Sequence, residues 1–178
     1  MIEDQWLEML ARIFEFYRVQ VTHTLVEEFM TEFENIPASI VYEGFRNWRA
    51  ADTKGFPPHV GMISREVNKI LFPALSRPFS EASRTNPLRI KAERRAGIRP
   101  VAYNPWGDGG PTTYESKRMG EAAAEIYEQL QEESLGKTTQ TLLREVLASG
   151  ERIALKNHLA SLGVTIKPHL KLVGSRHE

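Results

Sequence analysis

The amino-acid sequence predicts an all-α protein, and three observations lead to this prediction. Apolar residues recur at helical spacing over most of the chain. Residues with helix-capping chemistry stand before several of these stretches. Prolines and glycines gather between them, with six of the ten prolines in residues 73–112. The predicted order is a small N-terminal helical bundle over 1–72, a Pro/Gly-rich basic linker over 73–112 and C-terminal helices with a tail over 113–178.

Four short helices are expected in residues 1–72, each with its own apolar stripe. Thr24 and Glu27 have capping-box spacing at the start of the second helix. Pro37 suits the first turn of the third, and Pro57-Pro58 interrupts the chain before the fourth. The stripes are Trp6, Leu10, Ile13 and Tyr17; Leu25, Val26, Phe29, Met30 and Phe33; Ile40, Val41, Phe45 and Trp48; and Val67, Ile70 and Leu71.

The aromatic side chains of these stripes are expected to fill the bundle core. A domain of about 70 residues buries only about 60% of the surface that its unfolded chain exposes, so it needs large apolar side chains inside. This makes a base-stacking platform a poor interpretation of the set. The six aromatics are Trp6, Phe14, Phe29, Phe33, Phe45 and Trp48. The bundle is expected to fold alone.

Residues 73–112 are expected to form a weakly structured linker that contains one short basic helix over 88–97. The segment 77–100 carries seven basic and two acidic residues, a net charge of +5. Basic clusters of this kind can contact phosphates. The candidate nucleic-acid contacts are Arg89, Lys91, Arg94, Arg95 and Arg99.

Two further helical regions, over 113–133 and 138–162, are expected in the C-terminal part. The second has more apolar residues than a helical pair can bury, and residues 137–178 carry a net charge of +4. Such a helix could insert into an acidic or apolar groove of a partner. The candidate partner-binding residues are Leu142, Leu143, Val146, Leu147, Ile153, Leu155 and Leu159. The alternatives are packing against the 113–133 helix, or dimerisation.

No motif predicts catalysis, so the protein is expected to be no enzyme and to have no catalytic, cofactor-binding or metal-binding residues. Gly136-Lys137-Thr138 resembles the end of a phosphate-binding loop, but Gln131 stands where that loop needs its first glycine. Glu121, Glu125, Glu128 and Glu132 have helical spacing without a histidine, which favours a solvated helix face. The five histidines have no metal-ligand spacing.

Charge and composition give the expected setting. The formal net charge is zero and there is no cysteine, which excludes disulfides and thiolate zinc sites. No apolar run approaches the roughly 20 residues that span a bilayer. The first 35 residues hold eight acids and two arginines, unlike a signal peptide. A cytoplasmic protein without a membrane partner is expected.

One stretch of sequence resembles a known family. From Tyr17 the chain reads Y-R-V-Q-V-T-H-T-L-V-E-E-F, then F-E-N-I-P-A-S-I-V-Y-E-G-F-R-N-W-R-A, then G-F-P-P-H-V-G-M-I. Over about residues 5–72 this resembles the N-terminal helical domain of the phage replicative helicase loader/inhibitor family. The residues that carry the resemblance are Phe45, Trp48, Phe56, Pro57 and Pro58. No motif of the family is found from residue 73 onward.

The resemblance implies a non-enzymatic adaptor of phage DNA replication. Its partner would be a hexameric DnaB-type helicase, which it would restrain and load at an origin, with an origin-binding protein as a further partner. Such a protein would act in the cytoplasm of the bacterial host. The alternative is a nucleic-acid-binding regulator or packaging protein that uses the basic segment 77–100.

Overall fold

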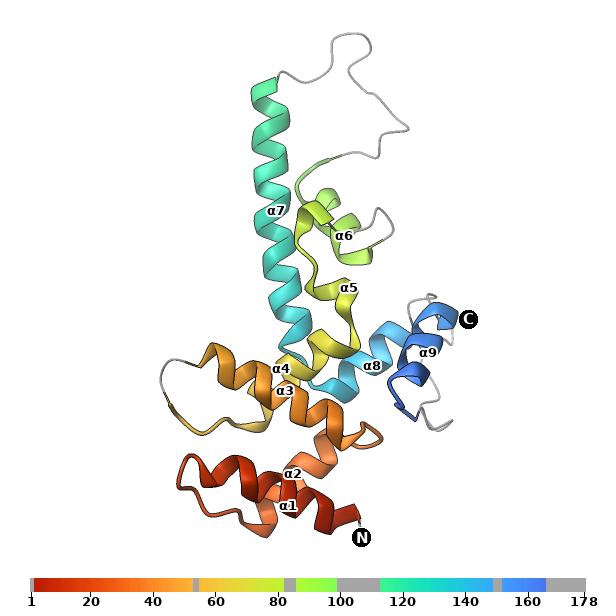
Figure 1. Cartoon of the computed structure of the whole chain (residues 1–178). Helices are drawn as coiled ribbons and strands as arrows, with labels where there is room; N and C mark the ends of the chain where they lie inside the picture. The colour runs from red at the N-terminus through yellow and green to blue at the C-terminus, as the bar shows by residue number, and fades with distance from the viewer. Residues whose placement is uncertain (1, 53–54, 82–85, 99–112, 149–151, 166–178) are drawn as a thin grey trace, which may run out of the picture. The chain divides into compact units, whose positions relative to one another are not determined.

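The computed structural model describes residues 2–52, 55–81, 86–98, 113–148 and 152–165, and every regular element in them is helical, as predicted (Figure 1). The described residues divide into two compact units. The first unit contains residues 1–71 together with the chain from 135 onward, and the second contains residues 72–134. The elements of the first unit are α1 (Ile2–Glu15), α2 (His23–Glu32), α3 (Ala38–Ala51), α4 (Val60–Leu71), α8 (Thr139–Ala148) and α9 (Arg152–Ser161). Those of the second are α5 (Pro73–Ser76), the 3₁₀ turn η1 (Phe79–Glu81), α6 (Pro87–Arg95) and α7 (Thr113–Leu135), whose last residue belongs to the first unit.

Aromatic rings fill the core of the first unit. Phe29 stacks on Phe45 with ring centroids 5.5 Å apart, and Phe14 meets both rings edge-on. Trp6 stacks on Phe33 at 6.3 Å. All five are buried, which confirms their predicted place in the core. Trp48 was predicted wrongly: it is only half-buried and its ring lies 6.0 Å from that of Tyr17.

The helices α3 and α4 form the most extensive packing in the first unit. Gly44 lies at their closest approach, where an added Cβ would stand 2.7 Å from Cγ2 of Val67. Val67 is fully buried and β-branched, so its side chain has little freedom to move. Gly44 therefore allows these two helices to pack as closely as they do.

The C-terminal helices α8 and α9 belong to the first unit, and the predicted separation of 113–178 from 1–72 was wrong. The leucines Leu142, Leu143 and Leu159 are buried there, and α8 packs on α4. After α9 the backbone N–H of Thr165 donates to the carbonyl of Asn35 at 3.2 Å. The core that the sequence assigned to residues 1–72 is thus completed by residues more than sixty positions later.

Residues 73–81 and 86–98 form α5, η1 and α6 with short connections and pack in the second unit, so the prediction of a weakly structured linker was wrong over these residues. Ala92 of α6 is buried with Tyr127 and Leu130 of α7, and Phe79 and Leu88 pack against them. The helix α6 agrees with the basic helix expected over 88–97. Residues 82–85 and 99–112 of the predicted linker lie outside the described residues.

Two helix ends use glycine in the left-handed region. After α9, Gly163 has φ +76°, the Val164 N–H donates to the Leu159 carbonyl and the Gly163 N–H to that of Ala160. After α6, Gly97 has φ +75° and the same bond pattern. Both are Schellman caps, in which glycine satisfies carbonyls that the helix leaves open.

Candidate functional site

The seven predicted partner-binding residues have different environments on α8 and α9. Leu142, Leu143 and Leu159 are buried in the first unit and present no surface to a partner. Val146, Leu147 and Leu155 are half-buried. Ile153 is 80% exposed, the most exposed of the large hydrophobic side chains of the described residues.

The four accessible members of this set stand at the end of α8 and at the start of α9. Val146 and Leu147 stand in the last turn of α8, and Ile153 and Leu155 stand in the first turn of α9. Both turns adjoin the short connection between the two helices, so the four residues share one end of the α8–α9 pair. This set of Val146, Leu147, Ile153 and Leu155 is named the hairpin tip. Water in contact with Ile153 is unfavourable, since burial of an isoleucine contributes about 1.5–3 kcal/mol.

A polar network fastens α8 to the rest of the first unit. The carboxylate of Glu32, at the end of α2, accepts hydrogen bonds from the Thr139 N–H at 2.6 Å and from the Ser64 hydroxyl of α4. The Thr139 hydroxyl donates to that of Ser64 at 3.3 Å. Glu32 thus binds the positive end of α8 and satisfies an amide that the helix leaves without a partner.

Asn68 of α4 makes a second attachment. Its side-chain amide donates to the carbonyls of Leu135 and Lys137 at 3.2 and 2.9 Å. Asn68 is fully buried, and its Oδ1 has no hydrogen-bond partner among the described residues. The contacts hold the chain that enters α8 against the last two turns of α4.

The predicted nucleic-acid contacts of α6 are partly engaged within the second unit. Arg89 donates to Glu93 at 2.9 Å and lies 5.5 Å from the centre of the Phe79 ring. Lys91, Arg94 and Arg95 are exposed. Arg94 and Arg95 stand in the last turn, where cations favour the helix dipole. Arg99 lies outside the described residues.

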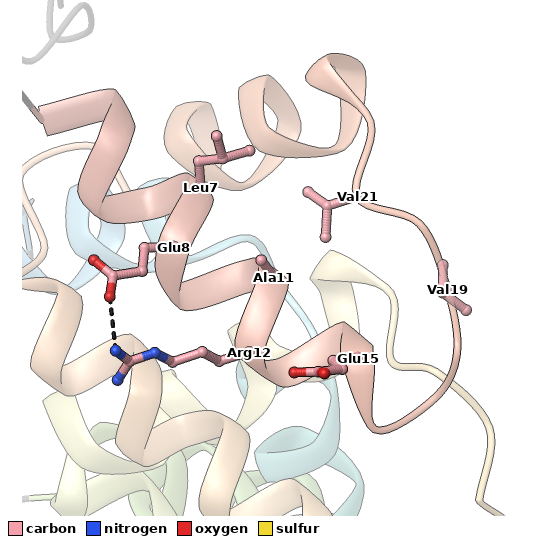
Figure 2. A pocket seen from close by; sticks show the side chains of 7 residues that line it. All are labelled: Leu7, Glu8, Ala11, Arg12, Glu15, Val19 and Val21. Atoms are coloured by element: carbon pink, nitrogen blue, oxygen red, sulfur yellow. Dashed lines mark hydrogen bonds and ion pairs between the residues drawn. The ribbon is translucent and has the colours of Figure 1, made fainter.

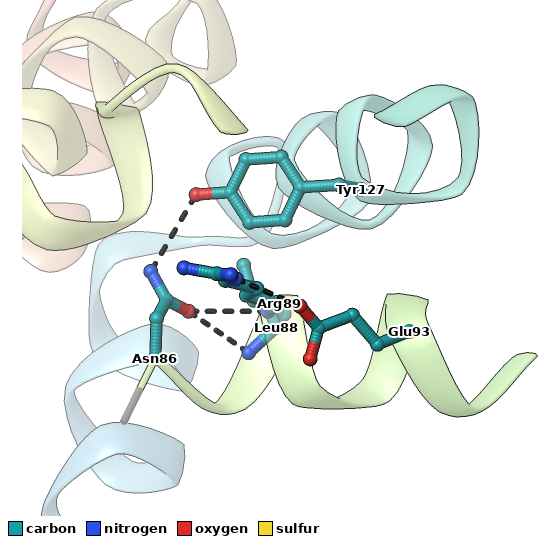
Figure 3. Close-up of polar contacts among 5 residues, drawn as sticks. All are labelled: Asn86, Leu88, Arg89, Glu93 and Tyr127. Atoms are coloured by element: carbon teal, nitrogen blue, oxygen red, sulfur yellow. Dashed lines mark hydrogen bonds and ion pairs between the residues drawn. The ribbon is translucent and has the colours of Figure 1, made fainter. Parts of the chain in front are cut away.

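Asn86 organises the start of α6 (Figure 3). Its Oδ1 accepts from the backbone N–H groups of Leu88 and Arg89 at 2.9 and 3.4 Å, and its amide donates to Tyr127 Oη at 3.5 Å. The Tyr127 hydroxyl donates to the Arg77 carbonyl at 3.1 Å. Burial raises the pKa of Tyr127, while the Asn86 hydrogen bond and Arg89 oppose the rise. These contacts give Asn86 and Tyr127 a structural role.

A groove that the sequence did not predict runs between α1 and α3. Its polar and aromatic lining consists of Arg12, Tyr17, Tyr42, Arg46, Trp48 and Arg49, named here the α1–α3 groove. Phe45 and Ile13 complete it. Tyr42 is 47% exposed, while Tyr17 and Trp48 are half-buried. Burial raises the pKa of Tyr17; Asp52 adds to the rise and Arg49 opposes it.

One signal in the sequence could have revealed this groove. Tyr42, Arg46 and Arg49 follow each other at four and three residues, so they share one face of α3. The apolar stripe with Phe45 and Trp48 on the same helix is the stronger periodic signal, and it predicts a core-facing surface rather than a groove.

An open hollow beside α1 is mainly apolar (Figure 2). Leu7, Ala11, Val19 and Val21 line it together with three charged residues of α1. Arg12 donates to Glu8 at 2.7 Å, and both side chains are well exposed, so the pair contributes little to stability.

The residues that carry the family resemblance are placed unequally. Phe45 is buried in the core and Trp48 lines the α1–α3 groove. Phe56 is 68% exposed, Pro57 is exposed and Pro58 is buried beside the start of α4. The Phe56-Pro57-Pro58 turn thus leaves one aromatic ring at the surface.

Within the part of the chain that the structure describes, no three histidine, aspartate or glutamate side chains are grouped so as to hold a metal ion. No helix there has both the length and the apolar character needed to cross a bilayer. Comparison of the chain with protein-family models, with curated proteins and with solved structures gave no match.

Proposed function

We propose that this chain is a non-enzymatic adaptor of phage DNA replication that binds a hexameric DnaB-type helicase, restrains it and loads it at an origin. The observation that carries the proposal is the hairpin tip. It gathers four aliphatic side chains at one end of two helices, and the most exposed of them, Ile153, gains the most from being covered. An apolar patch at a helix end suits a protein partner that accepts helix-borne anchors.

The choice of helicase as partner is supported by the order of the N-terminal elements. The helices α1 to α4 stand in the sequence order on which the resemblance to helicase loaders rests, with the Phe56-Pro57-Pro58 turn directly before α4. Arg144 of α8 and Lys156 of α9 are exposed, and the neighbouring Glu145 pairs with Lys137, so the charge of the two helices favours an acidic or apolar surface on the helicase.

The proposal is tested by binding of the purified full chain to the purified host helicase hexamer, followed by titration calorimetry. The change Ile153→Asp places a charge at the centre of the proposed contact. We expect it to weaken binding at least tenfold, about 1.4 kcal/mol, while the far-UV circular dichroism stays unchanged because Ile153 is exposed.

Leu7→Asp is the matched control, because Leu7 is another exposed large aliphatic residue of the first unit, 48% exposed on α1. It should bind the helicase as the wild type does. Equal affinity of Ile153→Asp and wild type would exclude the hairpin tip, and no binding of the wild-type chain would exclude the helicase as partner.

A further inference from the structure

We infer that the α1–α3 groove binds single-stranded nucleic acid. This is a second binding site, and it is independent of the helicase contact proposed for the hairpin tip. The inference starts from the composition of the lining: three arginines and three partly accessible aromatic side chains, without an acidic residue among the lining residues.

The aromatic side chains offer flat surfaces for unpaired bases. Tyr42 is 47% exposed and Trp48 is half-buried. The ring of Tyr17, which follows α1, lies 6.0 Å from that of Trp48. Bases in a duplex are stacked on each other and cannot use such surfaces, whereas single strands can.

The arginines can neutralise the phosphates between those bases. Arg46 is exposed on α3, and Arg49 is one turn further along the same helix. The guanidinium of Arg49 lies 3.9 Å from the centre of the Phe16 ring, a cation–π contact that holds the Arg49 side chain beside the groove. A guanidinium group suits bidentate contact with phosphate oxygens.

Charge elsewhere on these helices limits the affinity. Residues 1–35 carry a net charge of −6, so the groove is a local cationic patch in an acidic surrounding. Glu8 pairs with Arg12, and a phosphate would compete with this exposed pair. The Debye length of about 8 Å at physiological salt confines the repulsion to near neighbours. We therefore expect a short binding site of moderate strength rather than a long electrostatic track.

The basic helix α6 fits nucleic acid less well than the groove. The ring beside its cations among the described residues is Phe79, and that ring packs against Tyr127 at 5.2 Å. An acidic protein segment would satisfy the arginines of the groove but has no flat group for Tyr42 and Trp48. The combination of stackable rings with guanidinium groups is what selects single-stranded nucleic acid.

The test uses the full chain and a fluorescein-labelled oligothymidylate of about 20 nucleotides, followed by fluorescence anisotropy over a range of salt. Three neutralised phosphates predict that log K falls with log salt with a slope of about −2. Tyr42→Ser and Arg46→Gln, both at exposed positions, should each weaken binding about tenfold. The Trp48→Leu variant, checked by circular dichroism, should do the same.

The matched control removes the rival basic surface by replacing Lys91, Arg94 and Arg95 of α6 with glutamine. Affinity should not change. Loss of binding in this control with retention in Arg46→Gln would move the site to α6 and overturn the inference. So would an absence of binding at low salt, or equal affinity for a blunt duplex. Poly-L-glutamate that binds through Arg46 where oligothymidylate does not would identify an acidic protein segment as the occupant instead.

Discussion

Gly44 is the residue at which α3 and α4 depend on the absence of a side chain. We expect Gly44→Ala to destabilise the first unit by about 1–3 kcal/mol, because the new Cβ meets the stiff, buried Val67 at 2.7 Å. Urea unfolding followed by circular dichroism measures the change. A helix-propensity gain of about 1 kcal/mol opposes the clash, so a net gain in stability would mean that the helices separate easily.

Gly120 provides the matched substitution for this prediction. It lies inside α7, and an added Cβ there meets nothing within 4 Å. Gly120→Ala should therefore stabilise its helix by up to about 1 kcal/mol, through the lower backbone entropy of alanine. If the change in stability has opposite signs for Gly44→Ala and Gly120→Ala, the effect of helix packing is separated from that of helix propensity.

The ionisation of Tyr127 makes the stability of the second unit depend on pH. Its pKa is raised above the ordinary value of 10.0, chiefly by burial, so the neutral form is favoured in the folded chain. The stability that comes from burying the neutral Tyr127 hydroxyl is fully present below about pH 10, and it is lost as pH rises through the raised pKa. We expect the second unit to lose stability above pH 10, and Tyr127→Phe to remove this part of the pH dependence.

The measurement is ultraviolet absorbance of tyrosinate as a function of pH in wild type and Tyr127→Phe. The difference between the two titrations reports Tyr127 alone and should have its midpoint above pH 10. A midpoint at or below 10 would contradict the buried environment in which Tyr127 donates to the Arg77 carbonyl.

At the scale of elements, the carboxylate of Glu32 joins α2 to α4 and to the start of α8. Glu32→Ala leaves the N–H of the buried Thr139 and the hydroxyl of the buried Ser64 without this acceptor, so we expect a loss of about 1–3 kcal/mol. Hydrogen exchange should show faster exchange of the α8 amides, with α1 to α3 less affected. Glu28→Ala, an exposed position of the same helix α2, is the control and should leave exchange in α8 unchanged.

The elements themselves could be predicted because helical periodicity is a local property. The stripes of α1 to α4 and the basic α6 follow from residues three and four apart. The extent to which each apolar side chain is buried could not be predicted in the same way. Trp48 continues the stripe of Phe45, yet it is only half-buried and lines the α1–α3 groove.

The long-range polar contacts could not be predicted from the sequence either. Nothing local pairs Glu32 with Thr139, or Asn68 with the carbonyls of Leu135 and Lys137, since these partners are separated by 107 and by 67 and 69 residues. The buried positions of Leu142 and Leu143 follow from these contacts. A count of apolar residues correctly found that α8 and α9 need cover, but it could not identify α4 as the helix that supplies it.

At the scale of the molecule, the second unit is an insertion in the first. Asn68, one turn before the end of α4, contacts the carbonyls of Leu135 and Lys137, so the chain leaves and re-enters the first unit at neighbouring points. We expect that residues 72–134 can be replaced by a Gly/Ser linker of about six residues, which reaches roughly 13 Å on average.

The shortened chain should unfold cooperatively in urea and should keep the α1–α3 groove and the hairpin tip. Circular dichroism and the binding assays above provide the readouts. A control chain that ends at Gly136 lacks Leu142, Leu143 and Leu159 and should be much less stable, because each buried leucine contributes about 2–5 kcal/mol. Equal stability of the two chains would show that α1 to α4 need no help from α8 and α9.

The Glu32–Thr139 contact has a consequence for synthesis on the ribosome. The helices α1 to α4 emerge first, but α8 follows them only after the whole of residues 72–134. At about 5–20 residues per second this delay lasts roughly 3–13 s. During that time the surface of α4 that α8 later covers faces water or a chaperone, and the second unit is fully synthesised before α8 is. All residues of the second unit are thus present before those of the first unit are. Any slowing of translation after residue 134 prolongs the exposure of the incomplete first unit.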